Sequence, residues 1–172
     1  GFYKIPGDNL RSFDIIVNYL KQQDISNSVI VTPDLGFAKK GRNYAAALNL
    51  PLAFVEKRRV GNRSDREVLS LIGDVKGKNV IIVDDLVDTA GSICNAAKVV
   101  RERGALDVSI AFTHPVLSDP ACERLKAANI KEIITTDTLP IPPEKLLPNM
   151  TILTVAELLA EVILRSHEGR SV

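Results

Sequence analysis

Runs of apolar and β-branched residues alternate along the chain with segments whose apolar residues recur every three or four positions. Six such runs predict strands, at residues 28–32, 52–56, 79–84, 108–113, 132–136 and 151–154. Helical spacing predicts helices at residues 10–20, 45–50, 93–100, 121–129 and 155–166. Because the strands are apolar on both faces, we expect an α/β fold: a mostly parallel central sheet of about five to six strands, flanked by helices on both faces.

One segment breaks this alternation. Residues 57–67 contain five Lys or Arg residues and, apart from Val60, no strongly apolar residue. The pattern predicts a mobile loop that connects a strand to a short helix.

Length and charge narrow the class of protein. The 172 residues fit one domain, 1–172. Twenty-two Lys and Arg against 21 Asp and Glu leave a net charge of +1, so we expect no nucleic-acid or membrane partner held by global charge. Two cysteines and two histidines favour neither a disulfide framework nor a structural zinc site. With no membrane-spanning or targeting segment in view, the expected location is the cytoplasm.

The most informative segment begins where the third predicted strand ends. Four apolar residues, 80–83, lead directly into the carboxylates of Asp84 and Asp85. Ligands of open α/β sheets bind at the carboxyl ends of strands, and carboxylates there can hold a divalent cation or accept hydrogen bonds from sugar hydroxyls. The simpler alternative is that both residues only terminate the strand.

A small-residue turn follows and opens the next predicted helix. It consists of Asp88, Thr89, Ala90, Gly91 and Ser92. Backbone N–H groups of such a turn, together with the helix N-terminus, can bind a phosphate. The alternative is that Ser92 only caps the helix. Because a carboxylate pair and a phosphate cradle coincide within nine residues, we favour a site for a ribose 5-phosphate group.

Residues 84–92 resemble the phosphoribosyl-diphosphate-binding motif of type I phosphoribosyltransferase folds. More narrowly, the chain resembles the ribose-phosphate diphosphokinases, or PRPP synthetases, along essentially its whole length. Further segments that carry this resemblance, in the family's order, are residues 32–36, 56–59, 72–75, 113–115, 117–121 and 136–140.

The resemblance implies transfer of the diphosphoryl group of ATP to the C1 hydroxyl of ribose 5-phosphate, which gives phosphoribosyl diphosphate and AMP with Mg²⁺ as cofactor. It assigns ribose 5-phosphate binding to residues 84, 85 and 88–92, that is Asp84, Asp85, Asp88, Thr89, Ala90, Gly91 and Ser92. It assigns the diphosphate loop to Asp34, Leu35, Gly36 and Phe37. The implied metal ligands are Asp34, Asp84 and Asp85, and the implied catalytic residues are Lys57 and Arg59.

Among the departures from the family's pattern, two bear most directly on function. Phe37 stands where the family usually has a second glycine, and a side chain there restricts close backbone approach. Family members have a first domain of the same class that supplies much of the ATP site, so the chain corresponds to the second domain with the first absent. The implied partners are that N-terminal domain, or a partner subunit, and further copies of the chain, since the full-length family forms hexamers.

Three functions stay open at this point. The chain is the ribose-5-phosphate half of a PRPP synthetase, or a phosphoribosyltransferase that acts on a base, or a non-catalytic regulatory relative that associates with active synthetase subunits. No segment resembles the hood that the second class needs over its base. Phe37 favours the third class, whereas Lys57, Arg59, Asp84 and Asp85 favour the first.

Overall fold

The computed structural model describes residues 4, 7–59 and 67–172. In this part of the chain, seven strands form one sheet in the order β3-β2-β1-β4-β5-β6-β7. The strands are β1 (Ser28–Thr32), β2 (Leu52–Arg59), β3 (Glu67–Ile72), β4 (Asn79–Val87), β5 (Val108–Pro115), β6 (Ile133–Thr136) and β7 (Met150–Leu153). The helices are α1 (Phe13–Lys21), α2 (Ala38–Leu48), α3 (Gly91–Glu102), α4 (Ala121–Ala127), the 3₁₀ turn η1 (Pro143–Lys145) and α5 (Ala156–His167).

All six predicted strands and all five predicted helices are present, and the mostly parallel α/β architecture is confirmed. The short helix expected after the basic segment is wrong, because strand β3 occupies that place and pairs antiparallel with β2. Its residues alternate, and Leu69 and Leu71 pack against the core. Of the predicted loop 57–67, the two ends belong to β2 and β3, and residues 60–66 lie outside the described residues.

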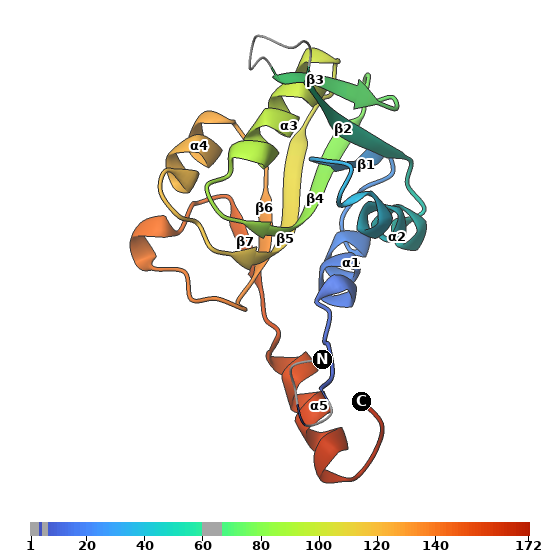
Figure 1. Ribbon diagram of the computed structural model, residues 1–172, viewed down its shortest axis with the longest axis vertical. Helices are drawn as coiled ribbons and strands as arrows, with labels where there is room; N and C mark the ends of the chain where they lie inside the picture. The colour runs from blue at the N-terminus through green and yellow to red at the C-terminus, as the bar shows by residue number, and fades with distance from the viewer. Residues whose placement is uncertain (1–3, 5–6, 60–66) are drawn as a thin grey trace.

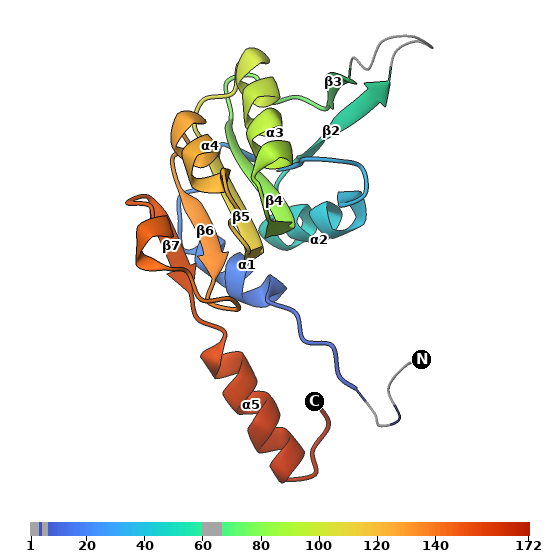
Figure 2. The ribbon, with the colours of Figure 1, turned by 60° about the vertical axis from the view of Figure 1, so that its left-hand side comes forward.

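The sheet lies between two hydrophobic cores, and the helices over its two faces can be followed in Figures 1 and 2. Helices α3 and α4 cover one face, and α1 and α2 cover the other. The alternation of side chains along β4 supplies both cores, because Val80 and Ile82 belong to the first and Ile81 and Val83 to the second. The helices therefore rest on both faces of β4 and fix its position at the centre of the sheet.

The order of the strands places a switch point between β1 and β4. From β1 the chain proceeds outward to β2 and β3, then returns to pair β4 with the other side of β1 in parallel. Residue Val31 lies opposite Ile82 in this register, so the two strands end side by side. In open α/β sheets, the crevice at such a reversal is where ligands bind.

Helix α5 stands apart from this body. In Figure 2 it projects away from the sheet. Its apolar side chains are open to solvent: Leu159 is 46% exposed and Ile163 is 69% exposed. The described helices include none long and apolar enough to cross a membrane.

Candidate functional site

A cavity of about 250 Å³ lies at the switch point, beyond the carboxyl end of β4. It is lined by Asp34 and by the continuous segment 84–93, which runs from the end of β4 into the first turn of α3. Asp34 follows β1 and therefore approaches the cavity from the neighbouring strand. The structure thus brings together eight of the residues that the sequence singled out: Asp34, Asp84, Asp85, Asp88, Thr89, Ala90, Gly91 and Ser92.

The carboxyl group of Asp84 is largely withdrawn from water. Burial raises its pKa to about 7, a backbone hydrogen bond from the N–H of Asp85 opposes the rise, and the negative charges of Asp85 and Asp34 add to it. That backbone bond, from the Asp85 nitrogen to Asp84 Oδ1, is 2.9 Å long. The charges of Asp85 and Asp34 therefore disfavour a negative charge on Asp84, and a cation in the cavity would offset that effect.

The neighbouring carboxylate has a different environment because it contacts helix α2. Lys40 Nζ lies 3.1 Å from Asp85 Oδ2. Partial burial works to raise the pKa of Asp85, but the hydrogen bond and the positive charge of Lys40 outweigh it and hold the pKa below its ordinary value. The pKa values of Asp84 and Asp85, adjacent in sequence, are thus shifted in opposite directions, because one is desolvated and the other is paired with Lys40.

Lys40 is a residue of the site that the sequence did not indicate. Its ammonium also lies 5.0 Å from the centre of the Phe37 ring, which fixes the side chain between α2 and the cavity. The sequence does place two lysines, Lys39 and Lys40, shortly after Asp34, and this was the sequence feature that could have indicated a cation near the carboxylates. The pairing itself joins residues 45 positions apart, and only the parallel contact of β1 with β4 creates it.

The loop after β1 is held by its own hydrogen bonds. Asp34 Oδ1 accepts a 3.0 Å bond from the Phe37 nitrogen, and Thr32 Oγ1 donates to the Asp34 carbonyl over 2.9 Å. The Phe37 side chain is 7% exposed and packs into the core beside α1 and α2. Its ring therefore serves as a core residue, whereas Leu35 is 49% exposed. Within the described residues, Leu35, Gly36 and Phe37 do not line the cavity, and their contact with diphosphate stays a prediction.

The phosphate-loop prediction concerns residues 88–92, where the chain turns into α3. Ala90 adopts a left-handed conformation with φ of 59° and immediately precedes the helix. No side chain caps this helix end, so the alternative that Ser92 serves as the cap is wrong. The first backbone N–H groups of a helix have no partner within the helix, and here the residues of the first turn of α3, 91–93, line the cavity. The turn is therefore suited to hold an anion.

A second residue that the sequence did not indicate is Arg124, which contacts the turn at residues 88–92. Arg124, on α4, donates from Nη1 to the carbonyl oxygen of Thr89 over 2.9 Å. A Cβ atom at Gly91 would lie 3.5 Å from the same Nη1. The guanidinium thus packs against the outer side of the phosphate loop.

Among the residues that the structure describes, no three or more His, Cys, Asp or Glu side chains are grouped closely enough to hold an ion. Mg²⁺, however, is commonly bound through one or two carboxylates together with water and substrate oxygens. The donor chemistry of Asp34, Asp84 and Asp85 suits that mode, and their role as ligands stays a prediction.

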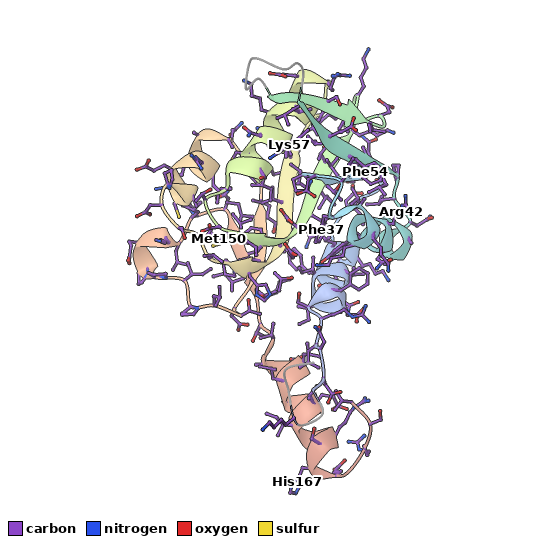
Figure 3. The ribbon with its side chains drawn as sticks, in the orientation of Figure 1. Phe37, Arg42, Phe54, Lys57, Met150 and His167 are labelled. Carbon is purple, nitrogen blue, oxygen red and sulfur yellow. The ribbon has the colours of Figure 1, made fainter. Side chains whose placement is uncertain are left out.

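The predicted catalytic residues lie on the adjoining edge of the sheet. Lys57 is exposed on β2, where it pairs with Leu69 of β3 (Figure 3). Arg59 ends β2, and its side chain lies outside the described residues. In the part of the chain that the structure describes, Lys57 is not a lining residue of the cavity. The structure therefore does not place Lys57 in the lining of the cavity, and the catalytic role of Lys57 and Arg59 stays a prediction.

Comparison with solved structures places this geometry in a known fold. The chain superposes on phosphoribosylpyrophosphate synthetase from Mycobacterium smegmatis with a TM-score of 0.88 and 39% identity, over 98% of this chain and 54% of that one. A purine phosphoribosyltransferase from Pyrococcus horikoshii matches with a TM-score of 0.53 and 18% identity, over 83% of this chain and 84% of that one. The second likeness shows the shared fold alone.

Sequence relatives agree with the first structure. Ribose-phosphate pyrophosphokinases from Caldanaerobacter subterraneus and Synechococcus elongatus are 45% and 44% identical to this chain over its whole length. The chain spans 54% and 52% of these two relatives, that is about half of each. Residues 60–172 match the family model described as the phosphoribosyl synthetase-associated domain. The chain therefore belongs to the phosphoribosyl synthetase-associated domain family.

Proposed function

We propose that the chain supplies the ribose-5-phosphate site and the catalytic segment of a ribose-phosphate diphosphokinase. The proposed reaction is attack of the C1 hydroxyl oxygen of ribose 5-phosphate on the β-phosphorus of ATP. The bond from that phosphorus to the α-phosphate oxygen breaks, AMP leaves, and the hydroxyl proton passes to solvent. The product is phosphoribosyl diphosphate.

The observation that carries this proposal is the set of residues that line the cavity at the end of β4. The lining includes the carboxylates of Asp84 and Asp85 and, a few residues further along the same segment, the start of α3 with Thr89 and Ser92. A sugar phosphate has hydroxyl groups at one end and a dianion at the other. The proposed orientation therefore places the 5-phosphate at residues 88–92 and the ribose hydroxyls at the carboxylates.

Charge in this cavity favours a cation-dependent reaction. Asp34, Asp84 and Asp85 would hold Mg²⁺, which would supply positive charge to neutralise phosphate oxygens. Asp84 and Asp85 would orient the sugar hydroxyls, while Lys40 limits the repulsion between Asp85 and an incoming phosphate. Lys57 and Arg59 would close over the transferring group from the β2–β3 edge, where the strand that carries them ends. Phosphoryl transfer depends on positioning and on neutralised charge, which these residues would provide.

The proposed partner is the other half of a longer protein. The chain spans about half of its pyrophosphokinase relatives, so roughly as much sequence again would accompany it in a protein of their kind. Helix α5 projects from the body with Leu159 and Ile163 open to solvent. Apolar faces of this kind mark interaction surfaces, and α5 is where we place contact with that half. ATP would bind between the two halves.

The direct test is phosphorus NMR of the 172-residue chain with ribose 5-phosphate, recorded with and without Mg²⁺. We expect Mg²⁺-dependent broadening of the sugar phosphate signal, and its loss in the double variant Asp84→Asn/Asp85→Asn. Asp74→Asn is the matched control, because Asp74 is an exposed carboxylate outside the cavity. Unchanged affinity in the double variant would overturn the site assignment.

A second measurement separates catalysis from binding. The chain is joined to the N-terminal half of a pyrophosphokinase relative and supplied with ATP, Mg²⁺ and ribose 5-phosphate. AMP and a new diphosphate ester are the expected products. Binding of both substrates without turnover would instead support the non-catalytic, associated role.

A further inference from the structure

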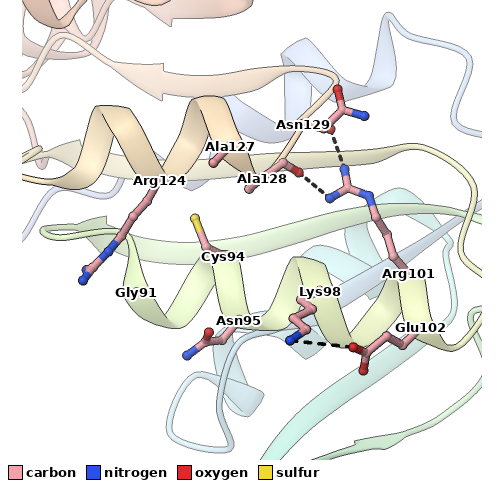
Figure 4. Close-up of a pocket in the computed structure, with 10 residues that line it drawn as sticks. All are labelled: Gly91, Cys94, Asn95, Lys98, Arg101, Glu102, Arg124, Ala127, Ala128 and Asn129. Carbon is pink, nitrogen blue, oxygen red and sulfur yellow. Dashed lines mark hydrogen bonds and ion pairs between the residues drawn. The ribbon is translucent and has the colours of Figure 1, made fainter.

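A second and larger cavity lies on the opposite side of the phosphate loop, in the groove between α3 and α4. Its volume is about 660 Å³, within the range of roughly 300 to 1,000 Å³ that small-molecule sites occupy. Figure 4 shows Cys94 on α3 pointing toward Ala127 and Ala128 at the end of α4. We call this cavity the α3–α4 groove.

The groove combines an apolar floor with a positive rim. The small side chains of Cys94, Ala127 and Ala128 leave its floor open, and more of its lining is apolar than polar. Its rim carries three cations and one carboxylate: Lys98, Arg101, Arg124 and Glu102. The net charge of the lining is therefore positive, and it favours an anionic ligand with an apolar body.

The three cations are not equivalent. Arg101 donates to the carbonyl oxygens of Ala128 and Asn129 and so holds the end of α4 in place. Lys98 lies 3.9 Å from Glu102, an exposed pair in which most of the positive charge is offset. These two residues shape the groove more than they attract a ligand.

Arg124 is the cation best placed to bind an anion. Its positive charge acts on the half-buried thiol of Cys94, where burial raises the pKa and Arg124 opposes the rise. A guanidinium carries five N–H groups, so the bond from Nη1 to the Thr89 carbonyl leaves it able to bind a carboxylate or phosphate as well. Arg124 therefore lines the groove and also contacts the turn at residues 88–92.

We propose that the α3–α4 groove binds a small organic anion, with its apolar body over Cys94, Ala127 and Ala128 and its carboxylate or phosphate on Arg124. The site is separate from the cavity proposed for ribose 5-phosphate and does not depend on that proposal. The two are linked physically, because Gly91 lines both cavities and Arg124 holds the carbonyl of Thr89 between them. An anion that binds the Arg124 guanidinium in the groove is expected to alter its hydrogen bond to Thr89, and so the conformation of residues 88–92. By linkage, an anion at that loop changes affinity in the groove by the same factor.

The test is a ¹H–¹⁵N NMR titration of the labelled chain with benzoate and, separately, with phenyl phosphate. Expected shifts cluster at the amides of Cys94, Asn95, Ala127 and Ala128. The more tightly bound probe distinguishes a carboxylate from a phosphate ligand. Inorganic phosphate, which lacks an apolar body, is expected to bind the groove at least about tenfold more weakly than the better probe.

Two variants and a control decide whether the groove is the site. Arg124→Gln removes the charge, and Ala127→Leu fills the cavity while Arg124 is kept; each is expected to weaken binding about tenfold or more. Lys126→Gln lies on the same helix outside the lining and is expected to change affinity less than twofold. Shifts spread over the whole surface, or equal affinity in Ala127→Leu, would overturn the proposal.

The link to the phosphate loop has its own readout. In the wild-type chain, saturation of the groove is expected to change the dissociation constant of inorganic phosphate at residues 88–92 at least twofold. An unchanged constant would overturn the link. Failure of ribose 5-phosphate to bind would overturn the proposed function and leave the groove titration unaffected, so the two failures are distinguishable.

Discussion

Lys40 and Asp85 form an ion pair 3.1 Å across, at the place where helix α2 meets the end of strand β4. Both side chains are at least half exposed, so the pair itself contributes little to folding. Its effect is on the cavity, because it holds one of two adjacent carboxylates in the charged state. Five predictions follow from this and neighbouring features.

Replacement of Lys40 tests the pair directly. Lys40→Gln is expected to raise the pKa of Asp85, since the hydrogen bond and charge that lower it are removed. The free energy of unfolding is expected to fall by less than about 1 kcal/mol. Carbon NMR of the Asp85 carboxyl during a pH titration measures the first effect, and urea unfolding measures the second. Lys39→Gln, next to it on the same helix, is the control, and equal pKa values in both variants would contradict the assignment.

The raised pKa of Asp84 predicts how stability depends on pH in metal-free buffer. Its folded pKa of about 7 exceeds the ordinary value of 3.8, so the folded state binds the extra proton between these values. The contribution of Asp84 to stability is therefore full below pH 4 and is lost as pH rises through 7. Asp84→Asn is expected to be more stable than wild type at pH 8, by on the order of 2 kcal/mol, and equal to it at pH 3.

Thermal unfolding in the presence of EDTA measures this difference across the pH range. The control is Asp88→Asn, which removes an exposed carboxylate from the same cavity. A constant gap between Asp84→Asn and wild type at all pH values would show that burial of the charge is not the cause.

Gly41 lets α2 approach β1 closely enough to place Lys40 at the cavity. A Cβ atom there would lie 2.3 Å from Cγ2 of the buried Thr32. Gly41→Ala is expected to lower the free energy of unfolding by about 1 to 2 kcal/mol, because the clash outweighs the gain in helix propensity. Urea unfolding is the measurement, with Lys39→Ala as the control for propensity on the same helix. A stabilised Gly41→Ala variant would mean that α2 is free to move outward.

The exposed side of α5 gives a prediction about assembly. In the isolated chain, Leu159→Gln/Ile163→Gln is expected to change the free energy of unfolding by less than about 0.5 kcal/mol, since both side chains already face solvent. Association with the N-terminal half of a pyrophosphokinase relative is expected to weaken at least tenfold, measured by sedimentation. Glu157→Gln on the same helix is the control. Equal association of both proteins would place the interface elsewhere.

Lys57 tests the proposed chemistry. In the joined protein, Lys57→Ala is expected to lower kcat by about a thousandfold, as loss of a cationic clamp on a transferring phosphoryl group does. The Michaelis constant for ribose 5-phosphate is expected to change little, because Lys57 does not line the described cavity. Steady-state kinetics with Lys39→Ala as control measure both quantities. A raised Michaelis constant with unchanged kcat would make Lys57 a binding residue instead.

The elements of this fold were predictable where their signal is local. Runs of apolar residues located every strand except β3. This short edge strand follows a long polar segment, and Leu69 and Leu71, which pack against the core, alternate in it with other residues, so it has no continuous apolar run that would predict a strand. The cavity residues on 84–92 were predictable as well, because one strand end and one turn contain them.

Contacts between distant elements were not predictable in this way. The bond from Arg124 to Thr89 joins positions 35 apart, and its formation depends on how α4 packs beside α3. The different environments of Asp84 and Asp85 likewise depend on which helix covers each face of β4. Residue type and spacing indicate that a carboxylate pair is present, but the fold decides which member pairs with a lysine and which has its pKa raised by desolvation.

The adjacency of β1 and β4 has a consequence for how such proteins can vary. Between these strands the chain passes through α2, β2 and β3 at one edge of the sheet, then returns to a fixed parallel register. Each doubling of the length of a loop between these elements lowers the free energy of unfolding by only about 0.6 kcal/mol through loop-closure entropy. Such a change need not disturb the pairing of β1 with β4. The reach of the segment that carries Lys57 and the geometry of the carboxylate cavity can therefore change independently of one another.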